Sequence, residues 1–257
     1  MSWEDARAKV LLVAGCGALA LTAVACSDKS GAEEGKGDEA AESAEASDEP
    51  TTTTIDPGDL EIRGPNGWRE IPLPTLGFGL AIPEAWEAVL LSSDGLDAVG
   101  QADPAVPGFA EAAHATAEAG GVFYAAGVES NDRVTDLKVR AATGTGITTA
   151  AGLYTYARTL ADEAGLAEAS IRTITDADRP TVVIRYSSDV ERADPDDPDA
   201  APQSVTIEGS EQLVVSPNGV VYSLIVTSEN PEGHDAFANR VFSTLSFPPP
   251  AAAADAP

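Results

Sequence analysis

The side chains with the greatest potential for catalysis or metal binding are two cysteines and two histidines. Cys16 and Cys26 both lie within the first 26 residues, so the rest of the chain has no thiol for a disulfide, a zinc site or a nucleophile. His114 and His234 belong to no His-x-x-x-His or Cys-x-x-Cys pattern. We therefore expect no metal site, with His114 solvated on a polar helix face and His234 partly packed in a first helical turn.

A serine hydrolase needs a nucleophile turn such as Gly-x-Ser-x-Gly, with a histidine to activate the hydroxyl. The sequence contains no such turn, and we interpret Ser187, Ser210 and Ser216 as ordinary strand or turn residues. Gly144-Thr145-Gly146 lacks both the lysine of a phosphate loop and a dinucleotide fingerprint, which favours a flexible connection. The sequence therefore predicts no catalytic residues and no cofactor.

One acidic segment could hold a hard cation, because calcium binds several carboxylate oxygens. It runs from Asp194 to Asp199 and contains Pro195 and Pro198 but no glycine, so it departs from the known calcium-loop pattern. We interpret it as a solvated loop between two strands, with calcium binding as the alternative.

The charge of the whole chain excludes one large class of partners. The sequence holds 42 acidic residues against 15 lysines and arginines, for a formal net charge of -27. Binding to a phosphate backbone requires clustered Lys and Arg, so nucleic-acid binding is not expected.

The N-terminus has the layout of an export signal. Arg7 and Lys9 precede an apolar stretch from Val10 to Ala25. At about 1.5 Å per residue this stretch is shorter than a hydrocarbon core of ~30 Å, which favours a cleaved signal peptide over a membrane-spanning helix.

A cysteine that could be lipidated follows the end of this stretch. Ala23-Val24-Ala25-Cys26 resembles the lipobox of bacterial lipoproteins, although the family pattern prefers Leu where Ala23 stands. The alternative Val13-Ala14-Gly15-Cys16 would leave too short an apolar core after Lys9. The resemblance implies that Cys26 is the lipidation site and anchors the protein outside the cytoplasm.

Residues 26–57 separate this anchor from the rest of the chain. They are rich in Glu and Asp, and Ile55 is their sole large apolar residue. Such a segment cannot bury enough apolar surface to offset its ordering entropy, so we expect a disordered acidic linker. As a random coil its ends would lie on the order of 30 Å apart.

Regular hydrophobic patterns begin near Gly67 and predict a series of strands. In 77–83, for example, Phe78, Leu80 and Ile82 alternate with small residues. Pro217-Asn218-Gly219 predicts a tight hairpin between the last two strands. The predicted strands are 68–73, 77–83, 122–128, 137–142, 170–175, 181–187, 204–216 and 220–227.

Three helices are predicted from apolar residues at helical spacing. Asp103-Pro104 should cap a helix that reaches Glu118. The clearest helix is 149–164, and Gly165 should end it. A closing helix is expected to begin at Asn230-Pro231 and to reach Thr244.

Strands joined by short turns imply an antiparallel sheet, and the helices can cover its faces, so the fold class is α+β. The expected organisation is a leader at 1–25, a linker at 26–57, one domain at 58–250 and a disordered tail at 251–257.

Two strings of the domain resemble PsbP-like domains. The first runs from Leu76 to Trp86, an aromatic strand that ends in Pro-x-x-Trp. The second is the hairpin from Glu211 to Thr227, followed by a helix and the final Ser246-Phe247. With the leader and linker, the chain resembles the LpqN/LpqT-type lipoproteins of actinobacteria. The resemblance implies an α/β/α sandwich with an antiparallel sheet and a binding or accessory role, and it carries over no active-site residue.

We therefore expect a lipid-anchored protein on the extracytoplasmic face of the cell membrane. Its expected role is non-catalytic, with an envelope protein or an apolar small molecule as its partner. The alternative is an envelope hydrolase whose site has an unfamiliar sequence pattern.

Overall fold

The computed structural model describes residues 60–248, apart from residues 61, 103, 130–132, 176, 193–200 and 202. The predicted leader, Cys16, Cys26, the acidic linker, the segment from Asp194 to Asp199 and the C-terminal tail lie outside the described residues. Within residues 60–248, as far as they are described, no helix is both long and apolar enough to cross a membrane.

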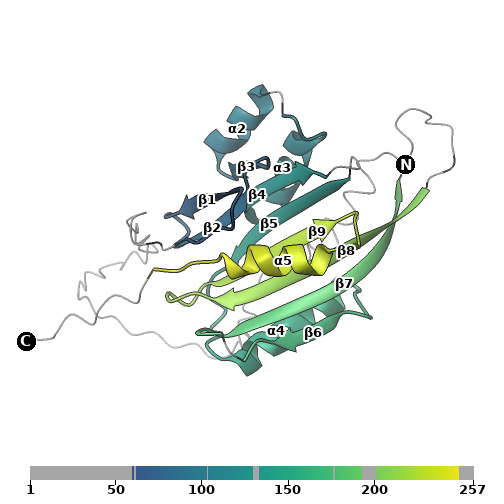
Figure 1. Ribbon diagram of the computed structural model, residues 1–257. Coiled ribbons are helices and arrows are strands. Elements are labelled where there is room, and N and C mark those ends of the chain that lie inside the picture. The colour runs from purple at the N-terminus through teal and green to yellow at the C-terminus, as the bar shows by residue number, and fades with distance from the viewer. Residues whose placement is uncertain are drawn as a thin grey trace, which may run out of the picture.

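The described chain forms four helices and two antiparallel sheets, which confirms the predicted α+β class (Figure 1). In chain order the elements are β1 (Trp68–Leu73), β2 (Phe78–Pro83), β3 (Glu87–Leu90), α2 (Ser93–Gln101), α3 (Phe109–Glu118), β4 (Gly121–Val128), β5 (Val134–Ala142), α4 (Ala150–Glu163), β6 (Ser170–Thr173), β7 (Thr181–Arg192), β8 (Gln203–Val215), β9 (Val221–Ser228) and α5 (His234–Ser243).

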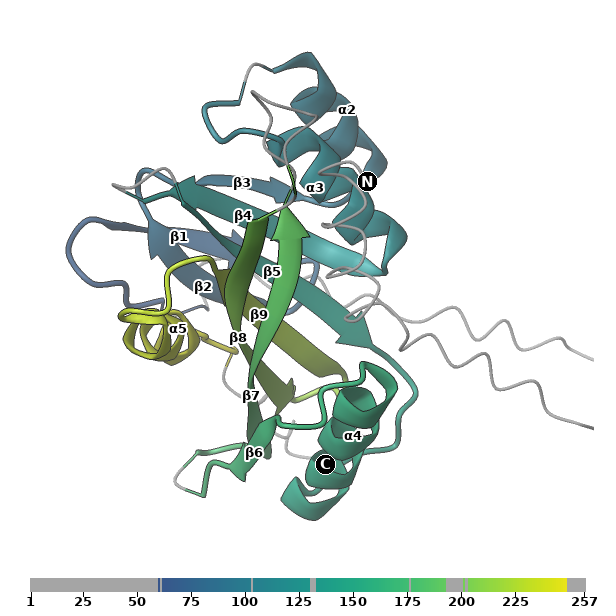
Figure 2. The ribbon, with the colours of Figure 1, turned by 90° about the vertical axis from the view of Figure 1, so that its right-hand side faces the viewer.

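The larger sheet has seven strands in the order β3-β4-β5-β9-β8-β7-β6. Every residue of β9 is buried, because this strand lies near the middle of the sheet and has neighbours on both edges. β1 and β2 form a separate two-stranded hairpin. Figure 2 shows α5 on one side of the large sheet, and α3 and α4 on the other.

The face of the sheet toward α5, which we call the α5 face, carries the largest apolar core. Alternate residues of β5 and β9, such as Leu137 and Leu224, pack there with Phe78 of β2 and Val241 of α5. All four side chains are fully buried. The β1–β2 hairpin and α5 therefore close this face together.

The opposite face, which we call the α3/α4 face, is apolar only at its two ends. Near β3 and β4, Tyr124 packs with Phe109 and Ala113 of α3. Near β7 and β8, Leu153 of α4 packs with Ile184 and its neighbours. The strands between these two apolar clusters, β5 and β9, carry a different kind of side chain on this face.

Two elements of the structure, α2 and β3, were not predicted from the sequence. Helix α2 was not predicted, although Ser92 caps it by accepting a hydrogen bond from the Gly95 amide at 3.2 Å. Strand β3 was not predicted either, since its four residues are too few to show a period. Both belong to the segment that covers the β4 edge of the sheet.

Two predicted helix starts were wrong by several residues. α3 begins at Phe109 instead of after position 103, and α5 begins at His234 instead of near Asn230. The residues before them, Gly108 and Gly233, have φ angles of 67° and 81°. A left-handed residue cannot continue an α-helix backward, so each glycine fixes the start that follows it.

The helix at 149–164 and the last hairpin were predicted correctly. Thr149 caps α4 by accepting a hydrogen bond from the Gly152 amide at 3.1 Å, and Leu153 and Ala157 are fully buried. In the turn between β8 and β9, the Gly219 amide donates to the Ser216 carbonyl at 3.0 Å. The predictions of these elements were correct because local sequence signals fix both of their ends.

Candidate functional site

A ring of polar side chains lies on the α3/α4 face at the centre of the large sheet. The register aligns Lys138 of β5 with Ile225 of β9, and Ile225 with Glu211 of β8. Paired residues of neighbouring strands point to the same face. We use the name polar ring for the polar residues that surround Ile225 in this register: Asp136, Lys138, Arg140, Glu211, Ser223 and Thr227.

The local sequence explains why these polar residues share one face. In β5, Asp136, Lys138 and Arg140 alternate with Leu137 and Val139, whose side chains are fully buried on the α5 face. Period-2 alternation sends the polar set to the opposite face. Since that face is apolar at both ends, the polar ring lies between two apolar clusters.

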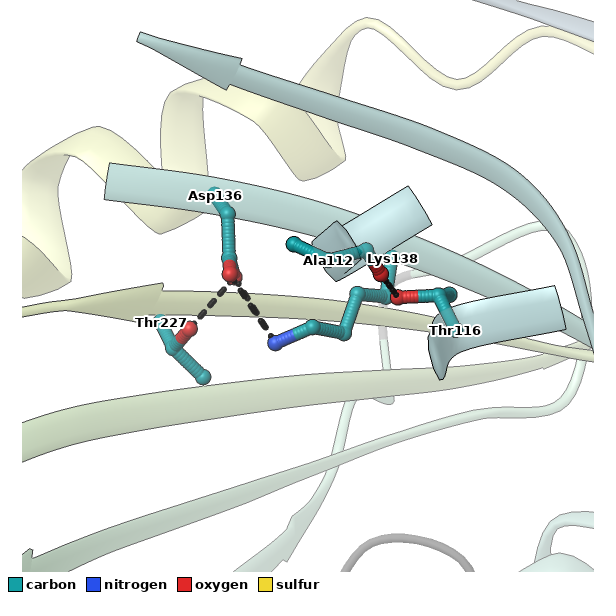
Figure 3. A network of polar contacts seen from close by, with 5 residues as sticks. All are labelled: Ala112, Thr116, Asp136, Lys138 and Thr227. Carbon is teal, nitrogen blue, oxygen red and sulfur yellow. Dashed lines mark hydrogen bonds and ion pairs between the residues drawn. The ribbon is translucent and has the colours of Figure 1, made fainter. Parts of the chain in front are cut away.

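The lysine of the polar ring is already neutralised by its neighbour. Lys138 Nζ lies 3.0 Å from Asp136 Oδ2 and donates to Oδ1 at the same distance (Figure 3). The Thr227 hydroxyl donates to the same carboxylate. The Lys138 and Asp136 side chains are only 7% and 16% exposed, so water screens this pair little. The pair is therefore internally satisfied.

The arginine of the polar ring is not satisfied. Arg140 Nε and Nη2 are buried, and neither donates a hydrogen bond within the described part of the chain. Burial lowers the pKa of Arg140, and the nearby Glu211 carboxylate opposes that shift. Among the described residues no carboxylate lies within ion-pair distance of the guanidinium. Burial of cationic N–H groups without a direct partner lowers the stability of the folded state.

Glu211 lies on the other side of Ile225, and one side-chain hydrogen bond reaches it from the described residues. The Ser223 hydroxyl donates to its Oε1. Burial raises the pKa of the Glu211 carboxyl, while the Ser223 hydrogen bond and the Arg140 charge lower it by less. Burial therefore shifts this carboxyl toward its neutral form.

Two tyrosines border the polar ring beside Glu211. Tyr186 of β7 lies over Gly209, where an added Cβ would come within 2.2 Å of its Cζ atom. Tyr156 belongs to α4. Burial is the main cause that raises the pKa of both phenols, so both stay neutral and can donate or accept.

The structure also brings together a serine and a histidine on the α5 face. His234 Nε2 lies 3.0 Å from Ser210 Oγ. Ser210 is 1% exposed and His234 is 5% exposed, and His234 Nδ1 is buried without a hydrogen-bond partner among the described residues. Arg185 of β7 donates to Asp235 of α5 at 2.7 Å beside this pair. A nucleophile needs access to its substrate and a third group to orient the histidine, and within the described part of the chain this pair has neither.

The other residues that the sequence analysis considered for catalysis or metal binding, as far as they are described, lie apart from the polar ring. His114 is exposed on α3, and Ser187 is exposed on β7. Ser216 bonds within the β8–β9 turn, where its hydroxyl accepts from the Val220 amide at 3.0 Å. In the described ranges, no group of three or more His, Cys, Asp or Glu side chains could hold a metal ion. The polar ring itself was not predicted, although the Asp-x-Lys-x-Arg alternation of β5 was a visible signal for it.

Neither a protein-family model nor a curated protein matches the chain. Among solved structures, one that resembles it is the solution structure of the cyanobacterial PsbP protein, CyanoP, from Synechocystis. The two chains are 16% identical, and the TM-score is 0.35. The alignment covers 72% of this chain and 94% of CyanoP.

Proposed function

We propose that this protein is a lipid-anchored lipoprotein on the extracytoplasmic face of the cell membrane, and that it binds a small ligand at the polar ring without catalysis. One observation carries the binding role: Arg140 is half-buried on the α3/α4 face, and its buried Nε and Nη2 atoms are unpartnered among the described residues. A ligand that accepts from these nitrogens would remove the cost of leaving them unsatisfied.

Stability alone does not account for the polar ring. Apolar residues at these positions would join the two apolar clusters on either side into one core. Replacing buried ionic groups by apolar residues of similar volume is often neutral or stabilising. Local departures from an optimal core are typical of functional sites, which supports a binding role for the polar ring.

The anchoring role is supported by the N-terminal sequence. An apolar stretch from Val10 to Ala25 leads to Cys26, and the acidic linker at 26–57 would hold the folded domain away from an anionic membrane surface. This combination of leader, linker and single domain resembles that of the LpqN/LpqT-type actinobacterial lipoproteins, and we propose membership of that group. An envelope protein as partner, or an apolar small molecule as ligand, stays an alternative.

The hydrolase alternative rests on Ser210 and His234, which lie within hydrogen-bond distance. For this pair to act, α5 would have to move away from β8, because both side chains are almost completely buried. The non-catalytic proposal is therefore favoured by their burial.

The anchor can be tested with one substitution and a matched control. Cys26→Ser should move the protein from the membrane fraction to the soluble fraction and abolish labelling by a fatty-acid probe, because the acylated sulfur is lost. Cys16→Ser should change neither result. If the Cys26→Ser protein remains labelled in the membrane fraction, the proposed anchor is wrong.

The binding role can be tested without assuming the ligand. The full chain would be titrated with a panel of sugars, amino acids, nucleosides, inorganic phosphate and monocarboxylates, with backbone amide NMR signals as the readout. We expect a member of the panel to shift amides of β5, β8 and β9. If none does so, the polar ring is not a small-ligand site of this kind.

A further inference from the structure

We propose that the polar ring binds a small aliphatic monocarboxylate whose two oxygens accept parallel hydrogen bonds from Arg140 Nε and Nη2. This inference rests on the proposed function of the polar ring as a ligand site, and it names the chemical class of the ligand.

The free edge of Arg140 fits the geometry of a carboxylate. Nε and Nη2 lie on the same edge of the planar guanidinium, and their N–H groups point in nearly parallel directions. Both are buried and donate no hydrogen bond within the described residues. A carboxylate presents two oxygens at matching separation and binds such an edge bidentately.

The other cation of the polar ring does not compete for the ligand. Lys138 is held by Asp136, which also accepts from Thr227. Displacing Asp136 would break an ion pair that water screens little, which is unfavourable. Arg140 is therefore the residue of the polar ring that is ready to accept an anion.

The charges of the polar ring favour a ligand with a single negative charge. Asp136 and Lys138 neutralise each other, which leaves Arg140 and Glu211. Burial raises the pKa of Glu211, and an anion bound beside it would raise that pKa further, so the Arg140 charge is left for the ligand to balance. A monocarboxylate balances that charge, whereas a phosphate dianion would add an unmatched negative charge beside Glu211.

The surroundings favour an aliphatic group behind the carboxylate. The hydroxyls of Ser223 and Thr227 already donate to Glu211 and Asp136, so they are not free to donate to a sugar-like ligand. Ile225, which is 2% exposed, forms the centre of the polar ring. Because Ile225 is almost completely covered, the protein would have to open at this point for a short alkyl chain to lie against it.

Butyrate is a suitable probe, with methyl butyrate as its uncharged counterpart. In calorimetric titrations of the full chain, butyrate should bind at least about 10-fold more tightly than methyl butyrate, because hydrogen bonds to a charged group are worth about 1.5–3 kcal/mol. Arg140→Lys keeps the charge but loses the two parallel donors, so it should weaken butyrate binding by about 10-fold or more. Arg158→Lys, at an exposed arginine of α4, should leave binding unchanged.

The outcomes separate this inference from the function on which it rests. If butyrate binds no better than its ester, or if Arg140→Lys binds butyrate as well as the unchanged protein, the carboxylate inference is overturned. If the amides of β5, β8 and β9 respond to phosphate or a sugar instead, the binding role stands and the ligand class is wrong. If no probe shifts those amides, both proposals fail. Circular dichroism of each variant would establish that it is folded.

Discussion

Replacing Arg140 by methionine should stabilise the ligand-free protein while it removes the proposed carboxylate site. Arg140 Nε and Nη2 are buried without partners in the described structure. Each buried unsatisfied donor costs about 1–3 kcal/mol, and attraction to Glu211 returns part of that cost. Methionine is unbranched and flexible enough to fill the space of the arginine stem. We expect the free energy of unfolding to rise by about 1–2 kcal/mol.

Urea unfolding of the full chain, followed by circular dichroism in a buffer without carboxylates, would measure this change. The midpoint should rise while the slope stays unchanged, since the surface exposed on unfolding is nearly the same. Thermal unfolding should show an increase of about 2–4 °C for each kcal/mol in a domain of this size. Arg158→Met should change stability by less than about 0.5 kcal/mol, because Arg158 is exposed. If Arg140→Met lowers stability by 1 kcal/mol or more, the guanidinium has structural partners and the reasoning from its free edge is refuted.

Three further predictions concern protonation and packing. Because burial raises the pKa of Glu211, and a bound carboxylate would raise it further, butyrate binding should take up protons. The calorimetric enthalpy should then depend on the buffer, and Glu211→Gln should remove that dependence. Burial lowers the pKa of His234 below 6.5, the ordinary value of a histidine. As the pH falls below about 6.5, the histidine is therefore protonated in the unfolded chain before it is protonated in the folded one, and the free energy of unfolding decreases. His234→Gln should make stability less sensitive to pH between about 7 and 5, as urea unfolding at each pH would show. Gly209→Ala should destabilise the protein by about 1–3 kcal/mol, because the added Cβ would collide with Tyr186. Gly100→Ala, whose Cβ would meet no atom within 4 Å, should be neutral or stabilising. Equal effects of the two substitutions in thermal unfolding would contradict this prediction.

The fold class followed from signals that are local in the sequence. Alternating residues in 78–83, the cap at Thr149 and the turn at Asn218-Gly219 each fix an element without help from the rest of the chain. Helix starts were predicted less well. Asp and Pro residues indicate where a helix can begin, but the left-handed Gly108 and Gly233 decide where it does begin.

The candidate site could not be predicted because it depends on strand order and register. Thr227 donates to Asp136, which lies 91 residues away in the sequence, since β9 inserts between β5 and β8. Alternation in β5 indicates a polar strand face, yet it does not say which strands lie beside it. Ser210 and His234 are close for a similar reason, because α5 crosses β8 at that point. Long-range pairing therefore determines both clusters.

The most direct test of the proposed binding role is the proton NMR signal of the Arg140 Nε–H group in the full chain. This proton is buried and donates no hydrogen bond within the described structure. At saturating butyrate the signal should move downfield and exchange more slowly with water, since a charged acceptor shortens and strengthens the hydrogen bond. A signal that stays unchanged when calorimetry shows butyrate to be bound would contradict the account, because the ligand would then lie elsewhere.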